Sequence, residues 1–287
     1  MKIPFTKMHG LGNNYIYIDG FETKINEELL PQLSQAVSDV NTGIGSDGLI
    51  LMLPSTNADV RMRIFNKDGS EAMNCGNGLR CVAKLAYDSG YVPKEQFQIE
   101  AKSGVVEAEV VVIDGIVEQV TIDMGEPILQ REQIPMVTAN YTNETVINEK
   151  FPVGDQDLFA TAVSMGNPHV IFYVEDINDA PIDTVGPEVT SDARFPEGVN
   201  VEFVEVLNDH EINFRVWERG SGITQACGTG ACASVVASVL NNYVKRGESV
   251  TVHLDGGDLT ITWEENGHVM MKGPAVNVAE GIYFLKT

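Results

Sequence analysis

The 287-residue sequence predicts an α+β protein of two pseudo-symmetric lobes, each an antiparallel-rich sheet wrapped round a buried central helix. Three observations lead to this fold class. One sequence pattern occurs twice at a nearly constant offset, both halves contain strands of alternating apolar and polar residues, and in each half a helix follows a Cys-Gly-x-Gly motif. Two such lobes would form a site in the cleft between them.

The repeat is clearest around two cysteines. Arg63-Ile64-Phe65-Asn66 precedes Cys75-Gly76-Asn77-Gly78, and Arg215-Val216-Trp217-Glu218 precedes Cys227-Gly228-Thr229-Gly230, at an offset of 152 residues (227 − 75). Other matches lie within two residues of this offset: Gly12-Asn13 with Gly166-Asn167, Asp47 with Asn200, and Asp114-Gly115 with Asn266-Gly267. Matches in the same order along the chain indicate two copies of one fold.

The elements follow from local patterns. Residues 60–65 and 213–217 alternate apolar and polar side chains, which predicts half-buried strands. Asp114-Gly115 between residues 110–113 and 116–122 is a type I′ hairpin signal, and Asn266-Gly267 indicates a second hairpin with a slightly longer loop. Residues 77–89 predict a helix that ends at Gly90. Residues 231–240 are apolar or small all round, which predicts a buried helix.

The joint between the halves is predicted near Gly125-Glu126-Pro127, where prolines begin to punctuate the chain. The last strand, residues 281–285, is expected to return to the first half. The predicted lobes are therefore residues 1–125 with 276–287, which carry Cys75, and residues 126–275, which carry Cys227.

Charge and composition narrow the partners. The chain has 19 Lys and Arg against 41 Asp and Glu, for a net charge of −22, which disfavours nucleic acid and anionic membranes. No stretch approaches 18 apolar residues, and the N-terminus lacks a secretory signal pattern. We therefore expect a cytoplasmic protein with reduced thiols, and we take two glycosylation-type triplets within residues 140–145 as chance matches.

The four cysteines do not predict a metal site. Their spacings of six (Cys75, Cys81) and five (Cys227, Cys232) do not fit a zinc pattern. Cys81 and Cys232 are expected to be buried small hydrophobes. Cys75 and Cys227 each precede a Gly-x-Gly and a helix, where unpaired amides and the helix dipole should lower a thiol pKa and hold a carboxylate.

Two such thiols related by pseudo-symmetry indicate chemistry that is itself mirror-symmetric. Inversion at a carbon needs a base on one face and an acid on the other, and a thiolate and a thiol can exchange these roles. The Cα proton of an amino acid is a suitable target, provided that the carboxylate is strongly stabilised. No pyridoxal-type lysine signature is apparent. A thiol redox protein or a zinc-binding protein is the alternative from another class.

Over nearly its whole length the chain resembles diaminopimelate epimerase, a cofactor-independent isomerase of the lysine and cell-wall pathway. The motifs that carry the resemblance are residues 7–13 (KMHGLGN), 65–71 (FNKDGSE), 74–81 (NCGNGLRC), 164–169 (SMGNPH), 195–200 (FPEGVN), 217–222 (WERGSG), 226–232 (ACGTGAC) and 272–275 (KGPA). The resemblance implies that family's fold and interconversion of LL- and meso-diaminopimelate. A related racemase for another amino acid, such as histidine, is the alternative among enzymes.

The resemblance also assigns roles to residues. Cys75 and Cys227 would be the catalytic thiols, with His169 and Glu218 helping them to exchange protons. Amides of Gly76, Asn77, Gly228 and Thr229 would hold the α-carboxylate, and Glu218 the reacting amino group. The distal amino-acid end would be bound by Asn13, Asn66, Asn167, Asn200 and Arg219. No cofactor and no metal is expected, and the family's habit of forming dimers implies a homodimer.

Overall fold

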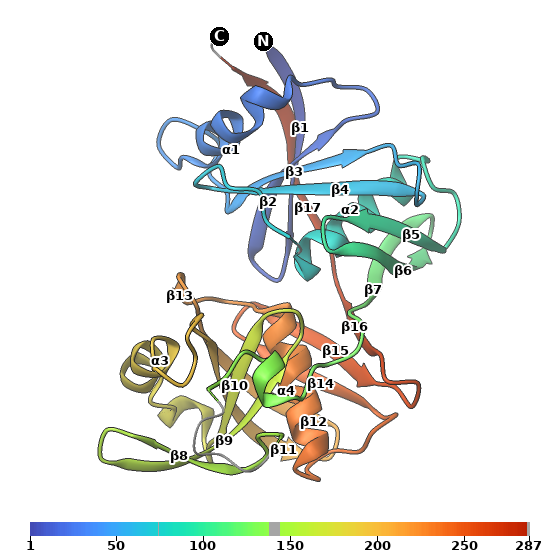
Figure 1. Ribbon diagram of the computed structural model, residues 1–287. Helices are drawn as coiled ribbons and strands as arrows, with labels where there is room; N and C mark the ends of the chain where they lie inside the picture. The colour runs from blue at the N-terminus through green and yellow to red at the C-terminus, as the bar shows by residue number, and fades with distance from the viewer. Residues whose placement is uncertain (74, 138–143, 286–287) are drawn as a thin grey trace. The chain divides into compact units, whose positions relative to one another are not determined.

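The computed structural model describes residues 1–73, 75–137 and 144–285. The chain forms two compact units, one of Met1–Asp123 with Lys272–Thr287 and one of Met124–Met271 (Figure 1). The predicted lobe boundaries, after residue 125 and before residue 276, lie close to these. The glycosylation-type triplets span residues 140–145, and both of their asparagines, Asn140 and Asn143, fall outside the described residues.

The first unit is a mixed sheet with two helices. Its elements are β1 (Lys2–Gly10), β2 (Asn13–Asp19), a 3-10 turn at Glu27–Leu29, α1 (Leu30–Ser38), β3 (Gly48–Leu53), β4 (Val60–Asn66), α2 (Gly76–Asp88), β5 (Gln96–Ala101), β6 (Gly104–Ile113), β7 (Ile116–Asp123) and β17 (Val276–Phe284). The pairs β17–β1, β1–β2, β3–β4, β5–β6 and β6–β7 are antiparallel. The pairs β2–β3 and β4–β5 are parallel.

The second unit repeats this plan. Its elements are a 3-10 turn at Arg131–Gln133, β8 (Glu149–Val153), β9 (Gln156–Ser164), β10 (Pro168–Tyr173), a 3-10 turn at Ile177–Asp179, α3 (Ile182–Thr190), β11 (Asn200–Asn208), β12 (Glu211–Glu218), β13 (Gly222–Ile223), α4 (Gly228–Leu240), β14 (Ser249–Leu254), β15 (Gly257–Trp263) and most of β16 (Val269–Gly273). The pairs β8–β9, β9–β10, β11–β12 and β14–β15 are antiparallel, and β10–β11 and β12–β14 are parallel.

The two units therefore share one order of pairings, parallel steps included. The register is also shared: Leu49 pairs with Phe65 in the first unit, and Val201 pairs with Trp217 in the second. Both pairs of equivalent helices keep the offset of 152. Helices α1 and α3 begin at residues 30 and 182, and α2 and α4 begin at residues 76 and 228. The repeat that the cysteine motifs predicted is confirmed across whole elements.

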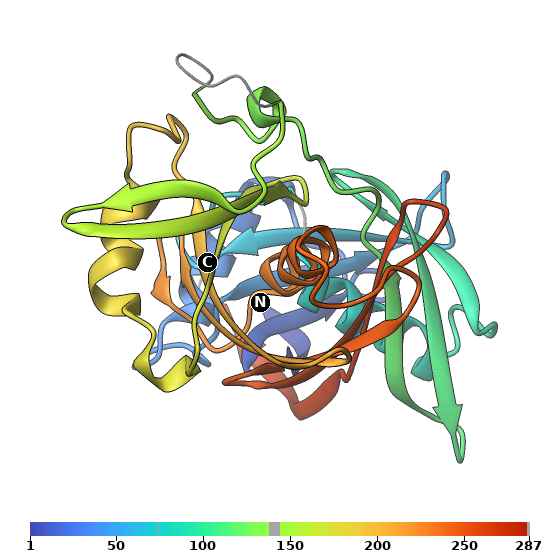
Figure 2. The same ribbon diagram turned by 90° about the horizontal axis from the view of Figure 1, so that it is seen from below.

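The helices α2 and α4 are the central helices of their units. Strands β1, β3, β4, β6 and β7 contact α2, and strands β9, β10, β11, β14 and β15 contact α4, which Figure 2 shows near the centre of the view. Because α4 consists of Gly, Ala, Ser, Thr, Val, Cys and Leu, strands can approach it from several sides, and nearly all of it is buried. Gly90, with φ +75°, follows the capping Ser89 and ends α2 as the sequence predicted.

Hairpins and cores hold the sheets. Asp114 and Gly115 have φ +51° and +80°, as a type I′ turn requires. The second hairpin is longer, since the Glu264 N–H donates to the His268 carbonyl across a bend at Gly267.

The apolar face of α1 packs on β2 and β3 in the first unit, whereas Phe151, Phe172 and Phe203 form an aromatic cluster in the second. Each buried ring stabilises the fold by roughly 2–3 kcal/mol.

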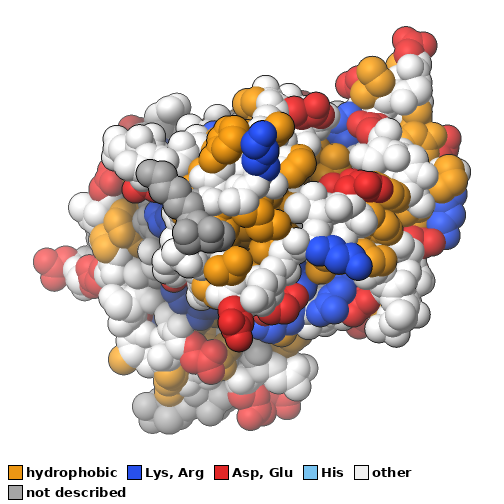
Figure 3. All heavy atoms as spheres, turned by 90° about the horizontal axis from the view of Figure 1, so that it is seen from above, with side chains coloured by type: hydrophobic (Ala, Val, Ile, Leu, Met, Phe, Trp, Pro, Cys, Tyr) orange, Lys and Arg blue, Asp and Glu red, His pale blue; other side chains and the backbone are white. Residues whose placement is uncertain are grey.

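Two surface features complete the description. Acidic side chains are spread over the face shown in Figure 3, in line with the net charge of −22. Among the described residues, the longest helices, α2 and α4, have 13 residues each and are too short to cross a membrane. The strand β17 pairs with β1 along Lys2–Phe284 to His9–Val276, so the last strand lies with the first unit.

Candidate functional site

Each central helix begins at a cysteine that caps it. Cys75 and Cys227 have extended backbones at the N-cap positions of α2 and α4, and each Sγ accepts a hydrogen bond from the N–H three residues later, Gly78 and Gly230, at 3.4 Å. This is the position where serine or aspartate usually caps a helix. The amides of the first turn point out of the helix end beside the sulfur, which makes the end suited to an anion.

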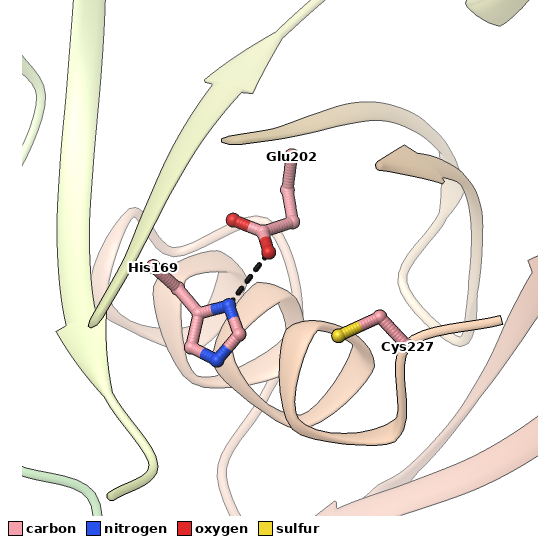
Figure 4. Close-up of side chains that lie close together, drawn as sticks. All are labelled: His169, Glu202 and Cys227. Carbon is pink, nitrogen blue, oxygen red and sulfur yellow. Dashed lines mark hydrogen bonds and ion pairs between the residues drawn. The ribbon is translucent and has the colours of Figure 1, made fainter. Parts of the chain in front are cut away.

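In the second unit, a buried histidine and a buried glutamate face the Cys227 sulfur (Figure 4). His169 comes from β10 and Glu202 from β11, and both are fully buried. Their Nδ1 and Oε1 atoms are 2.6 Å apart. Both side chains are in place because β10 and β11 run parallel next to each other, with His169 opposite Asn200.

Hydrogen bonds continue from this pair to the thiol. His169 Nε2 lies 3.0 Å from Asn167 Oδ1, and Asn167 Nδ2 donates to Thr229 Oγ1 at 3.3 Å. Thr229 Oγ1 in turn lies 3.6 Å from Cys227 Sγ. Three residues predicted for the site, His169, Asn167 and Thr229, therefore lie together beside Cys227.

Glu218 is the second carboxylate near this sulfur. It ends β12, and its carboxylate accepts a hydrogen bond from the Thr224 hydroxyl. Burial raises the pKa of Glu218, the negative charge of Glu202 raises it further, and the Thr224 hydrogen bond opposes both effects. A carboxyl with a raised pKa is suited to moving a proton near neutral pH.

Asn200 and Arg219 are hydrogen-bonded to each other just after the end of β12. The Asn200 side chain donates to the Pro168 carbonyl at 3.0 Å and accepts from the Arg219 N–H at 2.9 Å. The Arg219 guanidinium is exposed and donates through Nη1 to the Glu197 carbonyl at 2.6 Å. Asn200 thus anchors the backbone from which Arg219 extends.

One prediction for the thiols is wrong in the second unit. The helix position was expected to lower the pKa of each thiol, yet the pKa of Cys227 is raised. Burial is the largest cause, and the nearby charges of Glu218 and Glu202 add to it, whereas hydrogen bonds from Thr229 and Gly230 only partly oppose them. Burial, with two buried carboxylates added to it, outweighs the helix end and raises the pKa of the Cys227 thiol.

In the first unit, Cys75 lies beside polar amide side chains. Its thiol donates to Asn13 Oδ1 at 3.6 Å, and Asn77 Nδ2 donates to the same oxygen at 3.3 Å. The buried Arg80 donates to Asn77 Oδ1 at 2.9 Å. The pair Asn13–Asn77 occupies the place that Asn167–Thr229 occupies in the second unit, at offsets of 154 (167 − 13) and 152 (229 − 77) residues along the chain.

Two further residues hold this arrangement from behind. Asp47 accepts from Asn13 Nδ2 at 3.1 Å and from the Asn14 N–H at 2.8 Å, which turns Asn13 Oδ1 towards Cys75. Tyr15 is buried nearby; burial raises its pKa, and the charges of Cys75 and Asp47 add to that. Asn66 is the one predicted residue of this unit that bonds elsewhere, since its side chain donates to Ser70 Oγ at 3.0 Å.

Sequence reasoning missed Glu202, Asp47 and Arg80 as members of the site. Glu202 had a signal, because a glutamate in the otherwise apolar run Val201–Val204 of a buried strand is costly to bury. Arg80 also had one, since it follows Asn77 by three residues on a buried helix face. Asp47 was matched to Asn200 in the repeat but was given no role.

Cys81 and Cys232 are fully buried, as predicted, and neither is joined in a disulfide. Burial raises the pKa of Cys81 to about 11. Within the described parts of the chain, His169, Glu202 and Cys227 form the one group of three whose potential ligand atoms all lie within 4.8 Å of one another. Because the His169 and Glu202 atoms are hydrogen-bonded to each other, we interpret the group as a proton-sharing one. The expectation of a metal-free site remains a prediction.

Comparison with known proteins decides the family. The profile of diaminopimelate epimerase matches residues 5–130 and 161–278. The diaminopimelate epimerase of Geobacillus kaustophilus is 62% identical over 282 residues, covering 98% of this chain and 97% of the relative. That of Bacillus subtilis is 60% identical over 281 residues, covering 98% of each. The chain belongs to the diaminopimelate epimerase family. The resemblance that the motifs indicated is confirmed.

Solved structures agree on the fold. A PhzF-family phenazine biosynthesis protein of Bacillus anthracis superposes with a TM-score of 0.70 at 17% identity, covering 99% of this chain and 100% of that chain. A hydroxyproline epimerase of Agrobacterium vitis superposes with a TM-score of 0.68 at 15% identity, covering 98% and 91%. The predicted α+β fold class of the diaminopimelate epimerase type is confirmed.

The different surroundings of the four thiols predict an order of alkylation. With excess iodoacetamide at pH 7.5, the half-exposed Cys75 should react first and Cys227 at least about tenfold more slowly, since its raised pKa leaves little thiolate. Cys81 and Cys232 should react only on unfolding. Peptide mapping by mass spectrometry measures each site, and raising the pH should speed Cys227. Equal rates at Cys75 and Cys227 would contradict the assignment.

Proposed function

We propose that this chain interconverts LL- and meso-diaminopimelate without a cofactor, using Cys75 and Cys227 as a thiolate and a thiol on opposite faces of one α-carbon. The observation that carries the proposal is the matched pair of cysteine-capped helices, one in each copy of the repeat. Identities of about 60% to curated diaminopimelate epimerases over the full length support the choice of substrate.

The reaction balances with these groups alone. The thiolate takes the proton from the α-carbon, the electron pair of that C–H bond passes to the carbon and its carboxylate, and the opposite thiol delivers a proton to the other face. After the step the first sulfur is a thiol and the second is a thiolate, which are the states needed for the reverse direction. The raised pKa of Cys227, caused first by burial and then by nearby carboxylates, suits it to be the initial donor.

The weak acidity of the α-carbon is the main obstacle, and the helix ends address it. In the proposal, amides of Gly76, Asn77, Gly228 and Thr229 hold the α-carboxylate as negative charge moves onto it. Glu218, with its raised pKa, would bind the reacting amino group, and His169 with Glu218 would return protons to the thiols.

The distal end of the substrate carries a second amino acid group of fixed configuration. We propose that Arg219 binds its carboxylate through the guanidinium fork, and that amide side chains complete its recognition. Those side chains are Asn13, Asn66, Asn167 and Asn200. The exposed position of Arg219 and the anchoring of its backbone by Asn200 support this role. The predicted lobes, 1–125 with 276–287 and 126–275, would each contribute one thiol.

Loss of either sulfur should abolish epimerisation, because each direction needs both a base and an acid. Cys75→Ala and Cys227→Ala should each lower kcat for LL-diaminopimelate by at least about 1,000-fold. Solvent-deuterium uptake at the α-carbon, followed for each isomer separately, measures the residual proton exchange.

Cys232→Ala is the matched control, since it removes a buried sulfur five residues from Cys227, and it should retain most activity. Wild-type rates in either catalytic variant would refute the two-thiol scheme. Turnover of histidine but not of LL-diaminopimelate by the wild type would instead favour the related racemase.

Arg219 tests recognition of the distal carboxylate. Arg219→Met should lower kcat/KM for diaminopimelate by about 10- to 100-fold, because a charge-assisted pair with the substrate is lost. Arg215→Met is the control, since Arg215 lies four residues earlier, on β12, and pairs with Asp255. An unchanged kcat/KM in Arg219→Met would remove the distal carboxylate from the proposal.

We also propose a homodimer and a cytoplasmic location. Val278, Ile282 and Phe284 on β17 are 53%, 53% and 65% exposed, whereas Phe151 of β8, the corresponding strand of the second unit, is buried. A second copy covering β17 would remove this apolar surface from water. A reducing compartment would keep the two catalytic thiols from oxidation.

Disruption of β17 should dissociate the dimer. Phe284→Glu should shift sedimentation at micromolar concentration from dimer to monomer. The substitution removes an apolar ring from the proposed interface and would bury a charge there. Phe159→Glu, which changes a phenylalanine of 53% exposure on β9, should leave the dimer intact. A wild-type chain that sediments as a monomer would contradict the assembly.

A further inference from the structure

The two copies of the repeat differ beside their cysteines. A side-chain carbon at Gly78 would meet Ile50 Cδ1 at 2.7 Å, and one at the equivalent Gly230 would meet Glu202 Oε1 at 2.8 Å. Ile50 and Glu202 therefore occupy the same place in the two units. Each is the third residue of a strand, β3 or β11, that pairs in parallel with the strand before it. The first unit fills that place with a hydrocarbon and the second with a carboxylate.

Glu202 is costly for the fold where it lies. Its side chain is fully buried, and Oε2 has no hydrogen-bond partner within the described residues. Burial raises its pKa, and the nearby His169 opposes that shift. Because an isoleucine fills the equivalent position without such a cost, packing does not explain the glutamate.

The hydrogen-bond directions show what Glu202 does for its neighbours. Asn167 uses Nδ2 to donate to Thr229, so its Oδ1 faces His169 Nε2 and can only accept. Nε2 therefore carries a proton. The other ring nitrogen, Nδ1, shares a second proton with Glu202 Oε1 across 2.6 Å. Without an acceptor at Glu202, the imidazole could turn or change tautomer, and the chain from Asn167 to Cys227 would lose its direction.

We propose that Glu202 is a positioning residue for the Cys227 thiol: it fixes the His169 ring, which orients Asn167 and Thr229 against the sulfur. The proposal deepens the proposed function at the same site. Glu202 also places a negative charge within 4.8 Å of the sulfur. The charged or titratable groups facing Cys227 are His169 on β10, Glu202 on β11 and Glu218 on β12. In the first unit, Ile50 holds the position equivalent to Glu202.

Glu202→Gln tests the proposal, because the amide keeps the shape and removes the charge. The pH midpoint for iodoacetamide labelling of Cys227 should fall by about one unit or more, since a charge that disfavours the thiolate is gone, and the midpoint of Cys75 should stay unchanged. The kcat for diaminopimelate should fall about 10- to 100-fold with KM changed less than about threefold. Unchanged labelling of Cys227 would overturn the proposal.

Glu205→Gln is the matched control. Glu205 lies on the same strand and accepts hydrogen bonds from Ile177 N–H and Asn213 Nδ2, away from the sulfur. It should alter neither the labelling midpoints nor the split between kcat and KM. An equal shift of Cys227 labelling in Glu205→Gln would show that any lost carboxylate on β11 has this effect, and would overturn the specific role of Glu202.

A measurement on the unmodified chain covers the case in which Glu202→Gln fails to fold. Nitrogen-15 NMR of the His169 ring should show a proton on Nε2 and a strongly hydrogen-bonded proton between Nδ1 and Glu202. A ring that carries its proton on Nδ1 and leaves Nε2 unprotonated would overturn the proposal. Labelling and NMR need no turnover, so a chain inactive on diaminopimelate would refute the proposed function while these readouts still judge Glu202.

Discussion

The capping of a helix by a thiol is the interaction on which the rest of the site depends. At both helix starts the sulfur accepts, at 3.4 Å, the amide hydrogen bond that a serine or aspartate side chain would normally accept. This contact holds the sulfur at the end of a rigid, buried helix, beside amides directed at the same space. A sulfur in this position serves the fold and the chemistry together, because the group that ends the helix also faces the anion-binding amides.

Duplication supplies the symmetry, and a few substitutions break it. The strand order, the parallel steps and the cysteine caps are common to both units. The neighbours of the sulfurs are not: Asn77 corresponds to Thr229, Ile50 to Glu202, and Asn66 to Glu218. The first unit thus surrounds its thiol with amides and an arginine network, and the second with carboxylates and a histidine. Chemistry with an acid on one side and a base on the other requires this kind of difference, since two identical thiols would have no preferred resting state.

Much of this could be predicted from the sequence. The repeat, the two helices that each follow a cysteine, the Asp114-Gly115 turn and the burial of Cys81 and Cys232 all follow from local patterns that the structure confirms. The pKa of the Cys227 thiol could not be predicted from local patterns. It depends on burial and on carboxylates that the register of β10, β11 and β12 brings together. The helix end was visible in sequence, whereas the burial that overrides it was not. Contacts such as Glu202 with His169, 33 residues apart, arise only once the parallel pairing is known.

The return of β17 to β1 links the two ends of the chain. The N-terminal ammonium group donates to the Leu285 carbonyl at 2.7 Å, and β17 pairs with β1 along its length. The second unit, by contrast, is one continuous segment, Met124–Met271. During synthesis the ribosome therefore makes the whole of the later unit before it makes β17, the closing strand of the earlier one. Until then the nascent chain exposes the edge of β1 that β17 will cover, and an unpaired strand edge of this kind is open to wrong pairing and a target for chaperones.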